Sequence, residues 1–555
     1  MSSDSFMEAI YKGSFDHRYM DSFRSVGKNE EVERVLDNFR QILEEYPPSS
    51  LESEGRIPRE MLKKMGATGL FGLSIPRTYG GRGFSLWEYL RIVEEMAGLD
   101  ISVALVSLAH LSIGIKGIVL FGNDDQKRKY LAPGASGDMI FAYALTEPRI
   151  GSDARHIETR AELSKDESHY VLNGTKTYIT NANYAGGLTV FAQMDPRQPG
   201  FMGAFIVETA WEGVKIGKDM PKMGLKASST ASIQFRDVRV PRENLLAGPG
   251  EGFKIAMAIL NYGRIGLGAA SVGMMNQSVM DMLKRSATRE QFGGPISRFP
   301  LIQEKVVKAR AHSLVSASMN DFTAGLLADN PNSGLAIESS HCKLFGTTRA
   351  WDVLYDALQT AGGSGYISTQ PYEKRMRDFR VATVFEGTTE IHSIYPPLFA
   401  IRQIGRQMEA AGSGRMHQIS FLLKNLFRRM EWPLKFAKKE MRKASRFARS
   451  NARAVKRLVL LGMLFHGKRL QDKEYLLRRI TTLSLYLFGV LALLARITAN
   501  LKSGTAGKED LSLLEIFVEE AKEVSRANRR LFDSRREALN GRIFSDLLSG
   551  FKRGE

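Results

Sequence analysis

The spacing of apolar residues changes twice along this 555-residue chain, and that change limits the folds open to it. Up to about residue 144 the spacing is helical, with stops at Pro47, Pro48 and the glycine-rich loop 79–83. Between residues 145 and 247 the period falls to two, in short segments at 170–175, 188–192, 203–207 and 232–235. Helical spacing returns at residue 252. The pattern predicts a helical unit, then a small β-barrel or sandwich, then a helical bundle.

We therefore expect an α+β, mainly α fold in four parts, because 555 residues are too many for a single hydrophobic core. The expected parts are an N-terminal α-helical domain at 28–144, a middle β-barrel domain at 145–251, a C-terminal four-helix bundle at 252–408 and an additional helical domain at 415–555. The glycine-rich segment 410–414 is typical of a linker. Beyond it, Pro433 is expected in the first turn of a helix that ends near Phe465, followed by helices within 473–501 and 510–548.

The single cysteine, Cys342, excludes an internal disulfide and a thiolate metal site, and the adjacent His341 does not indicate a metal ligand. We expect no metal and a reducing compartment. The first ten residues contain Asp4 and Glu8 and no basic start before an apolar run, so no targeting peptide is predicted. The longest apolar stretch, 483–495, is shorter than the roughly 20 residues that a spanning helix needs and is expected to be a buried core helix.

Positive charge is concentrated in one stretch of the chain. The net charge is +18 and the pI about 9.7. Within 411–460, fourteen lysines and arginines face only Glu431 and Glu440. Small apolar residues recur there at three- and four-residue intervals, namely Ala437, Met441, Ala444, Ala448 and Val455. The basic region 424–457 is thus typical of an amphipathic helix on an anionic membrane. The alternatives are a solvated basic face and a nucleic-acid contact, and the lack of interleaved aromatics makes nucleic acid unlikely as a partner.

Several segments combine glycines with hydroxyl-bearing, aromatic or forked-donor side chains. Residues 145–154 have the sequence Leu-Thr-Glu-Pro-Arg-Ile-Gly-Ser-Asp-Ala, in which hydroxyls and backbone N–H groups accompany a glycine that permits close approach. Residues 176–181, Lys-Thr-Tyr-Ile-Thr-Asn, place an aromatic ring beside a hydroxyl. Further along, Arg289 is a forked donor suited to phosphate, and the Gly-Gly-Ser-Gly run at 362–365 lets backbone amides approach one.

Glu386 stands out because Phe385-Glu386-Gly387-Thr388 follows the segment Met-Arg-Asp-Phe-Arg at 376–380. In order and spacing these segments, with Asn261 and Arg264, resemble the acyl-CoA dehydrogenase family over roughly residues 20–403. The resemblance implies that Glu386 is the base that removes the α-proton of an acyl-CoA. In the family a hydride passes from the β-carbon to flavin N5, and the base's own N–H and a ribityl hydroxyl bind the thioester carbonyl.

The same resemblance implies FAD as cofactor, acyl-CoA as substrate, electron-transferring flavoprotein as acceptor and a homodimer in which the positions of Arg289 and Phe292 reach the neighbouring subunit's flavin. The implied FAD contacts are Tyr143, Leu145, Thr146, Gly151, Ser152, Tyr178, Ile179, Thr180, Arg289, Phe292, Gln303, Gln359, Gly362, Gly363, Thr388 and Glu390. The implied substrate contacts are Ser152, Asn261, Arg264, Phe385, Gly387, Gly114 and Gly117. Tyr178 departs from the family, which usually has tryptophan there, so the environment of the flavin ring is open to change.

Two features indicate the long-chain branch of that family. The chain continues for about 150 residues past the Glu-Gly-Thr segment, as the very-long-chain enzymes do. Gly114 and Gly117 match small residues at the blind end of the acyl pocket, where short-chain relatives have bulkier side chains. The alternative is ordinary close helix packing at Gly-x-x-Gly. We expect a peripheral protein on the cytoplasmic, inner face of a membrane, acting in fatty acid β-oxidation. The rival functions are an acyl-CoA oxidase, a non-enzymatic assembly factor and a nucleic-acid-binding relative.

Overall fold

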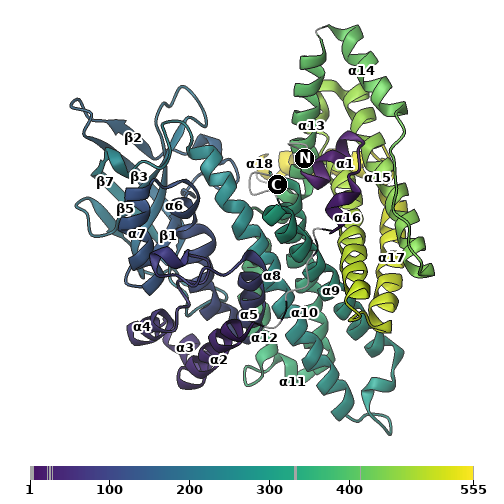
Figure 1. Ribbon diagram of the computed structural model, residues 1–555, viewed down its shortest axis with the longest axis horizontal. Helices are drawn as coiled ribbons and strands as arrows, with labels where there is room; N and C mark the ends of the chain where they lie inside the picture. Colours follow the sequence, from purple (N-terminus) through teal and green to yellow (C-terminus); the bar gives the residue numbers. More distant parts are fainter. Residues whose placement is uncertain are drawn as a thin grey trace. The chain divides into compact units, whose positions relative to one another are not determined.

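Figure 1 shows the computed structural model of the chain, which describes residues 5–21, 23, 27, 29–329, 334–412 and 414–553. The chain forms two compact units. The larger unit comprises Val26–Asn320 and Phe345–Thr388, and the smaller unit comprises Met1–Ser25, Asp321–Leu344 and Thr389–Glu555. Helices α9 (Pro300–Asp329) and α10 (Ala336–Ala361) each contribute residues to both units. The units therefore cut the chain differently from the four parts expected along the sequence.

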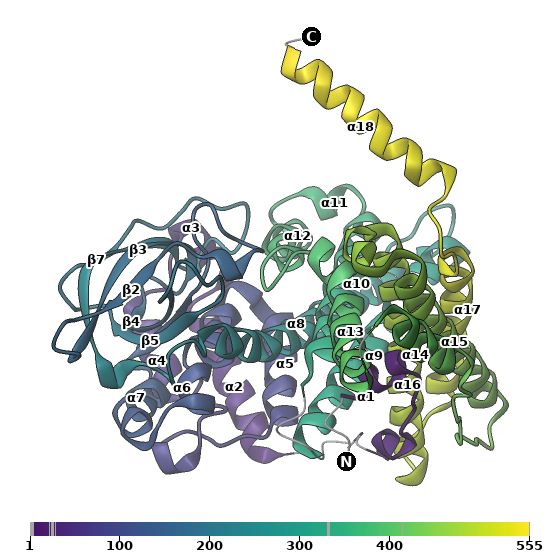
Figure 2. The ribbon, with the colours of Figure 1, turned by 90° about the horizontal axis from the view of Figure 1, so that it is seen from above.

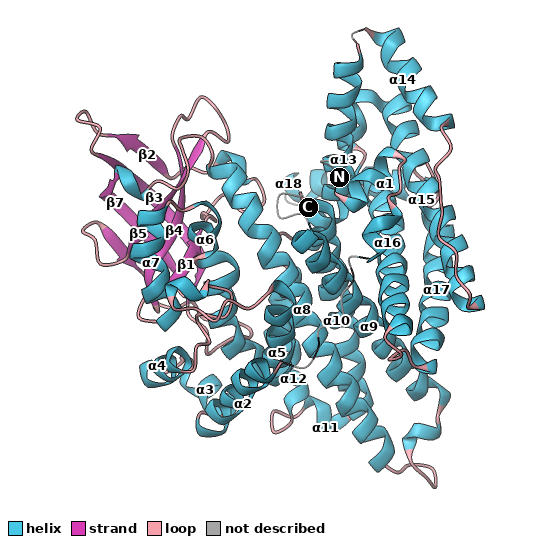
Figure 3. Cartoon of the chain, in the orientation of Figure 1, coloured by secondary structure: helices cyan, strands magenta, loops and turns pink. Residues whose placement is uncertain are grey.

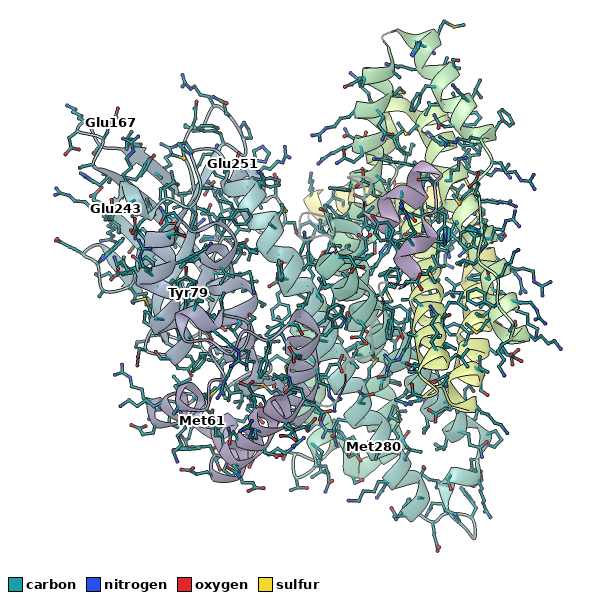
Figure 4. All side chains as sticks on the ribbon, viewed as in Figure 1. Met61, Tyr79, Glu167, Glu243, Glu251 and Met280 are labelled. Carbon is teal, nitrogen blue, oxygen red and sulfur yellow. The ribbon has the colours of Figure 1, made fainter. Side chains whose placement is uncertain are left out.

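The larger unit begins with helices and confirms the predicted helical N-terminal region. Its helices are α2 (Glu30–Glu45), α3 (Pro48–Glu54), α4 (Arg59–Ala67), α5 (Leu86–Ala109), α6 (Lys116–Phe121), α7 (Asp124–Ser136), α8 (Gly252–Thr288), α11 (Gly363–Tyr366) and α12 (Pro371–Phe379). Side chains cap several of them: Ser85 and Glu88 form a capping box at α5, and Asn123 and Gln126 form another at α7. In Figure 4 the long α8 runs from beside Glu251 past Met280.

The middle of the larger unit is a single curled sheet of seven strands, drawn in magenta in Figure 3. The strands are β1 (Ile140–Ala144), β2 (Arg160–Leu163), β3 (His169–Thr180), β4 (Ala185–Gln193), β5 (Met202–Glu208), β6 (Val214–Ile216) and β7 (Thr230–Pro241). Their order is β1-β4-β2-β3-β7-β6, with β5 on β4. All four predicted strand segments lie within β3, β4, β5 and β7. The first strand, β1, corrects the expected all-helical stretch to residue 144, because Ile140–Ala144 pairs in parallel with β4.

Helix α5 is broken in its interior at Asp100, whose φ of −156° and ψ of 111° are not helical. The Asp100 carboxylate accepts the backbone N–H of Val103 at 2.9 Å and so caps the second part of the helix. That part continues into a π-helical turn, η3 (His110–Gly114), which packs against β1 and α8. π-Helical turns are often found at functional sites, so the region between η3 and α8 is a candidate site.

The smaller unit contains helices and loops and no strand among its described residues. In addition to parts of α9 and α10 it contains α1 (Phe6–Lys12), α13 (Thr389–Ala411), α14 (Arg415–Phe427), α15 (Lys439–His466), α16 (Glu474–Lys502), α17 (Lys508–Asn528) and α18 (Arg535–Arg553). The expected linker separates α13 from α14, with positive φ at Gly412 and Gly414; Ser413 lies outside the described residues. In Figure 2 α18 leaves the end of α17 and extends away from the other helices of its unit.

The prediction that Pro433 opens a helix is wrong. Helix α15 begins at Lys439, and residues 429–438 follow an irregular course. Tertiary contacts hold this segment: Trp432 stacks on Phe15 with ring centroids 4.2 Å apart, and its Nε1–H donates to the Ser445 hydroxyl at 3.0 Å. These contacts override the local helix signal.

The apolar side of α15 is also not available to a membrane, contrary to our expectation. Met441, Ala444, Ala448 and Val455 are buried, and α15 packs against α14, α16 and α17. Helix α16 contains the apolar stretch 483–495. Within the described residues it is one of three helices long and apolar enough to cross a membrane by length and composition, with α5–α6 and α8. Its most apolar window is 89% buried within the protein, in line with the predicted core helix.

Helix α1 docks against the far end of the sequence. Its apolar residues Phe6, Met7, Ile10 and Tyr11 are buried, and the helix packs on α13 and α15. The Met7 N–H donates to the buried Glu338 carboxylate at 2.8 Å, and the Tyr11 hydroxyl lies 2.6 Å from the Ser484 hydroxyl on α16. The first helix of the chain is thus an integral part of the smaller unit.

Candidate active site

Glu386 lies in a tight turn that follows α12 and η7 (Arg380–Thr383). Its φ is +57° and that of Gly387 is +99°. A left-handed conformation at a residue other than glycine costs about 1–3 kcal/mol and tends to persist where function requires it. Eight non-glycine residues of the described structure have positive φ, and three of them, Tyr178, Phe292 and Glu386, are residues that the sequence predicts for the site. Three of the eight strained backbone positions are therefore predicted site residues.

The Glu386 carboxylate lies directly against α8 at Gly263. A Cβ at position 263 would be 3.0 Å from both Cδ and Oε1 of Glu386, and 2.8 Å from Cγ2 of Ile113 in η3. Only a glycine leaves this space to the carboxylate. The Glu386 side chain is thus held between the α8 backbone and the π-helical turn.

Arg264, the next residue of α8, contacts the same turn. Its buried guanidinium donates from Nε to the Glu386 carbonyl oxygen at 3.3 Å and from Nη1 to the Asn261 side-chain oxygen at 3.4 Å. Tyr143 on β1 faces this group, and burial, followed by the charge of Glu386, raises the pKa of its phenol well above the usual value. The structure therefore brings four predicted residues, Glu386, Arg264, Asn261 and Tyr143, to one place.

A second group forms where the 145–152 loop meets β3. The Thr177 N–H donates to the Thr146 carbonyl at 2.9 Å, and Lys176 Nζ donates to the Leu145 carbonyl at 3.0 Å and to Glu147 at 2.8 Å. The Glu147 carboxylate is buried and also accepts the N–H of Thr159. Burial acts to raise its pKa, but Lys176 outweighs that effect and the pKa is lowered. Glu147 is therefore a structural anion that fixes the loop.

The exposed side of this loop fits a polar planar ligand. The hydroxyls of Thr146, Ser152 and Thr180 make no hydrogen bond within the described parts of the chain, and a Cβ at Gly151 would meet open space. Tyr178 is 67% exposed at a bulge in β3. Three available hydroxyls, an open glycine and an aromatic ring are the groups that a flavin edge requires. Ile179, between them, points into the sheet core.

A third group lies at the C-terminal end of α8. Arg289, Phe292, Gln303, Gln359, Gly362 and Gly363 are all exposed, and Phe292 is 88% exposed. Arg285 Nη2 donates to the Ala361 carbonyl at 3.2 Å, which ties the end of α8 to the glycine-rich turn. Arg264 and Arg289 are 25 residues apart on and just after one helix, so these two groups lie about 38 Å apart along its axis. The structure does not bring the third group to Glu386.

Phe385, Gly387 and Thr388 adjoin Glu386 in the turn and are half-buried, whereas Glu390 belongs to α13 in the smaller unit. Gly114 and Gly117 are close-packed. A Cβ at Gly114 would lie 2.4 Å from the Phe141 carbonyl oxygen. Close packing is therefore sufficient to explain the glycine at position 114. A Cβ at Gly117 would lie 3.1 Å from the end of Ile259, 3.2 Å from the end of Leu246 and 3.6 Å from the Thr189 methyl group.

The fold and these groups define a flavin-dependent dehydrogenase of acyl thioesters, and comparison with known proteins gives the family. The family models for the N-terminal, middle and C-terminal domains of acyl-CoA dehydrogenases match residues 29–138, 142–238 and 250–394. The chain belongs to the acyl-CoA dehydrogenase family. It is an oxidoreductase of β-oxidation type that dehydrogenates acyl-CoA with FAD as its cofactor.

Among its relatives, the very long-chain specific acyl-CoA dehydrogenase of Macaca fascicularis is 34% identical over 90% of this chain and 80% of its own length. The short-chain specific enzyme of Rattus norvegicus is 36% identical over 62% of this chain and 83% of its own. The structure of a Bacillus anthracis acyl-CoA dehydrogenase complexed with FAD superimposes with a TM-score of 0.82 and 28% identity, covering 96% of this chain and 93% of that one.

Sequence reasoning missed two features of the site. The contact between Gly263 and Glu386 joins residues 123 positions apart, and the only local signal was a glycine in the interior of a predicted helix. The role of Asp378, within the segment 376–380 that the sequence singled out, depends on partners far away in the chain, described below.

Proposed function

We propose that this chain oxidises long-chain or very-long-chain fatty acyl-CoA to trans-2-enoyl-CoA, with Glu386 removing the α-proton. The observation that carries this is the position of Glu386: its carboxylate is confined between Gly263 and Ile113, and its backbone carbonyl accepts a hydrogen bond from Arg264. An acyl-CoA α-C–H is a very weak acid, so the base must be fixed and shielded from water. The strained turn and the close glycine contact favour one orientation of the carboxylate.

In this proposal Glu386 takes the α-proton as the enolate charge develops on the thioester oxygen, and its own N–H is the donor to that oxygen. Arg264, which holds the Glu386 carbonyl, keeps that peptide group oriented. When bound, FAD supplies the acceptor for the hydride that leaves the β-carbon. Thr146, Ser152 and Thr180 would hold the flavin edge, with Tyr178 over the ring. Electron-transferring flavoprotein is the proposed final acceptor.

Anaerobic mixing of the purified holoprotein with acyl-CoA of increasing chain length tests this proposal. The flavin absorbance should bleach, fastest with long chains, and turnover should appear with an artificial electron acceptor. Absence of bleaching with every chain length would contradict the enzymatic role and favour an assembly function. Rapid reoxidation in air with hydrogen peroxide release would identify an oxidase instead.

The long-chain preference is supported by the extension beyond the family core. The family models end at residue 394, yet the very-long-chain relative matches 90% of the chain, whereas the short-chain relative matches only 62%. The sequence identities to the very long-chain and short-chain relatives are nearly equal, at 34% and 36%. The C-terminal extension, and not the identity, therefore distinguishes the long-chain from the short-chain branch. The flexible neighbours of Gly117 are consistent with a pocket floor that a larger side chain would fill.

We also propose that the protein is a homodimer. Phe292, Leu301 and Tyr366, in the segments that contain Arg289 and the glycine-rich turn, are large exposed hydrophobic side chains, and such exposure favours burial. Because this group lies about 38 Å along α8 from the base, it would complete the FAD site of a second copy. Light scattering of the holoprotein tests this, and Phe292→Asp should weaken both dimer and FAD retention. A monomer that keeps its FAD would contradict it.

The proposed membrane contact of the basic region differs in detail from the helix first expected. On α14, Met416, Leu423 and Phe427 are exposed beside Lys424. On the adjacent α15 the exposed Arg442, Arg446, Arg453 and Arg457 are spaced to lie on one face. An apolar stripe next to a basic one suits an anionic lipid surface, which supports a peripheral position on the inner face of a membrane.

Vesicle sedimentation decides between lipid and other anions. Binding to vesicles with anionic lipid, weaker in high salt and lost in Phe427→Ser/Met416→Ser, is the expected result. Equal binding to neutral vesicles would contradict the charge argument. Salt-dependent binding to DNA without binding to vesicles would favour the nucleic-acid alternative.

A further inference from the structure

Lys374 on α12 is shared by two buried carboxylates from distant parts of the larger unit. Its Nζ donates to Asp100 at 2.8 Å and to Asp378 at 2.6 Å. The side chains of Asp100 and Asp378 are only 4% and 3% exposed. One ammonium between two buried carboxylates is a strongly directional arrangement, because moving any member leaves a buried charge uncompensated. We refer to Asp100, Lys374 and Asp378 as the carboxylate clamp.

The carboxylate clamp joins the break in α5 to the helix that precedes the base. Asp100 is the residue at which α5 bends and caps the part that leads into η3. Asp378 is eight residues before Glu386, with only η7 and the turn between them. Lys374 therefore fixes the bend in α5 to the helix that leads into the Glu386 turn.

The second oxygen of Asp378 extends the clamp to the sheet. It accepts the N–H of Leu225 at 2.6 Å, and Leu225 has a φ of +52°. The preceding Gly224 lies so close to α12 that a Cβ there would be 2.2 Å from the Arg377 carbonyl carbon. The loop before β7 is thus pressed onto the backbone that leads to Glu386.

Hydrogen bonds also connect the loop before β7 to β3, which carries Tyr178 and Thr180 and which we call the flavin strand. Four residues after Leu225, the Ser229 carbonyl accepts the N–H of Asn181 at 3.0 Å. Asn181 directly follows Thr180, is fully buried, and donates from Nδ2 to the Val106 carbonyl on the second part of α5 at 2.9 Å. These hydrogen bonds therefore lead back to the second part of α5, which Asp100 caps and which continues into η3. They connect that helix, the flavin strand and the turn that carries Glu386.

We propose that Lys374, with Asp100 and Asp378, is a positioning group that sets the Glu386 carboxylate relative to the flavin strand and the acyl chain. In this proposal it acts through the turn that carries Glu386 and not through contact with the substrate or the cofactor. Weakening the clamp should slow α-proton removal and change substrate or FAD affinity much less. This inference rests on the proposed role of Glu386.

The test separates proton removal from the complete reaction. A 3-thia acyl-CoA has no hydrogen at position 3 to transfer, so exchange of its α-hydrogens with D2O reports the base alone. Lys374→Met risks unfolding because it strands two carboxylates. The triple variant Asp100→Asn/Lys374→Met/Asp378→Asn is therefore the main probe, since neutral replacement of a buried ionic group is often tolerated. In this variant the side-chain oxygen of Asn at position 100 can still accept the N–H of Val103 and cap the helix.

The expected result is that the holo triple variant keeps its FAD and its melting temperature within a few degrees, while α-exchange at saturating analogue slows at least tenfold. The half-saturating analogue concentration should change less than threefold. Arg375→Met is the matched control, because Arg375 lies on the same helix and pairs with Asp281 outside the clamp; its exchange rate should match the wild type. Lys374→Arg should restore part of the rate.

Two outcomes would overturn the positioning role: exchange within twofold of wild type in the triple variant, or equal slowing in Arg375→Met. If the triple variant loses its FAD or fails to fold, a merely structural role is established instead. Failure of the wild-type holoprotein itself to exchange the α-hydrogens would contradict the proposed role of Glu386 and not the clamp alone.

Discussion

Gly263 gives the Glu386 carboxylate its place: the two residues are so close that a methyl group at 263 would lie 3.0 Å from Oε1. The neighbouring Ile113, 2.8 Å from the same point, closes the other side. A base in such a confined position is sensitive to changes smaller than a bond length. This contact gives the most direct test of the site.

Gly263→Ala should displace the carboxylate and lower the rate of anaerobic flavin reduction at least tenfold, while the fold and FAD content persist. Gly266→Ala, one turn along the same helix, is the control, because its Cβ would lie 3.9 Å from Ser112 and Tyr89, an ordinary contact. Stopped-flow absorbance measures both. Equal effects of the two substitutions would mean that helix packing and not the base is responsible.

Glu386→Gln should keep a yellow, folded protein and abolish turnover. The amide has the size of the carboxylate but cannot accept the proton, and general-base catalysis contributes about 10²–10⁴-fold. Steady-state turnover together with the flavin spectrum measures this. Substantial remaining activity in a protein with full FAD content would remove Glu386 from its role.

Gly117→Gln should shift the preference towards shorter acyl chains. The new side chain must occupy space now bordered by Ile259 and Leu246, whose ends can move without displacing backbone. The ratio of kcat/KM for long and medium acyl-CoA is the measurement. An unchanged chain-length profile in a stable variant would favour packing as the sole reason for the glycine, as at Gly114.

Glu338 should make the smaller unit less stable at high pH. Burial raises the pKa of its carboxyl from 4.5 to about 7, so its stabilising contribution is complete below pH 4.5 and is lost as pH rises through 7. The effect is at most about 3 kcal/mol. Glu338→Gln should flatten the decrease in melting temperature between pH 5 and 8 and raise stability at pH 8. A variant with the same pH dependence as wild type would assign that dependence to other groups.

The sequence alone predicted what depends on local pattern. Helical and alternating periods placed the N-terminal helices and the four strand segments. The Phe-Glu-Gly-Thr segment lies in a turn against α8, and the role of Glu386 as the base stays a prediction. Residues whose role is set by distant partners could not be predicted. Pro433 had the local signature of a helix start, but the stacking of Trp432 on Phe15 overrides it.

The basic helix illustrates the same limit. Its apolar residues Met441 and Ala448 have amphipathic spacing, which indicates that one face is covered but not by what, and the structure shows that neighbouring helices cover it. In the same way Asp378 belonged to a recognisable segment, while its partners Lys374 and Asp100 become meaningful only when α5 is seen to bend. Which residues contact one another across the fold is determined by the tertiary structure and not by the local sequence pattern.

The docking of α1 has a consequence for synthesis on the ribosome. Tyr11 meets Ser484, a residue 473 positions later. At about 5–20 residues per second roughly half a minute to a minute and a half passes before the binding surface of this helix is complete. During that interval Phe6, Met7 and Ile10 are only partly covered, because Phe322 and α13 are made before α15 and Ser484. The segment that carries α1 is therefore a stretch on which holding chaperones have time to act, and its contacts are completed only after α16 has been made.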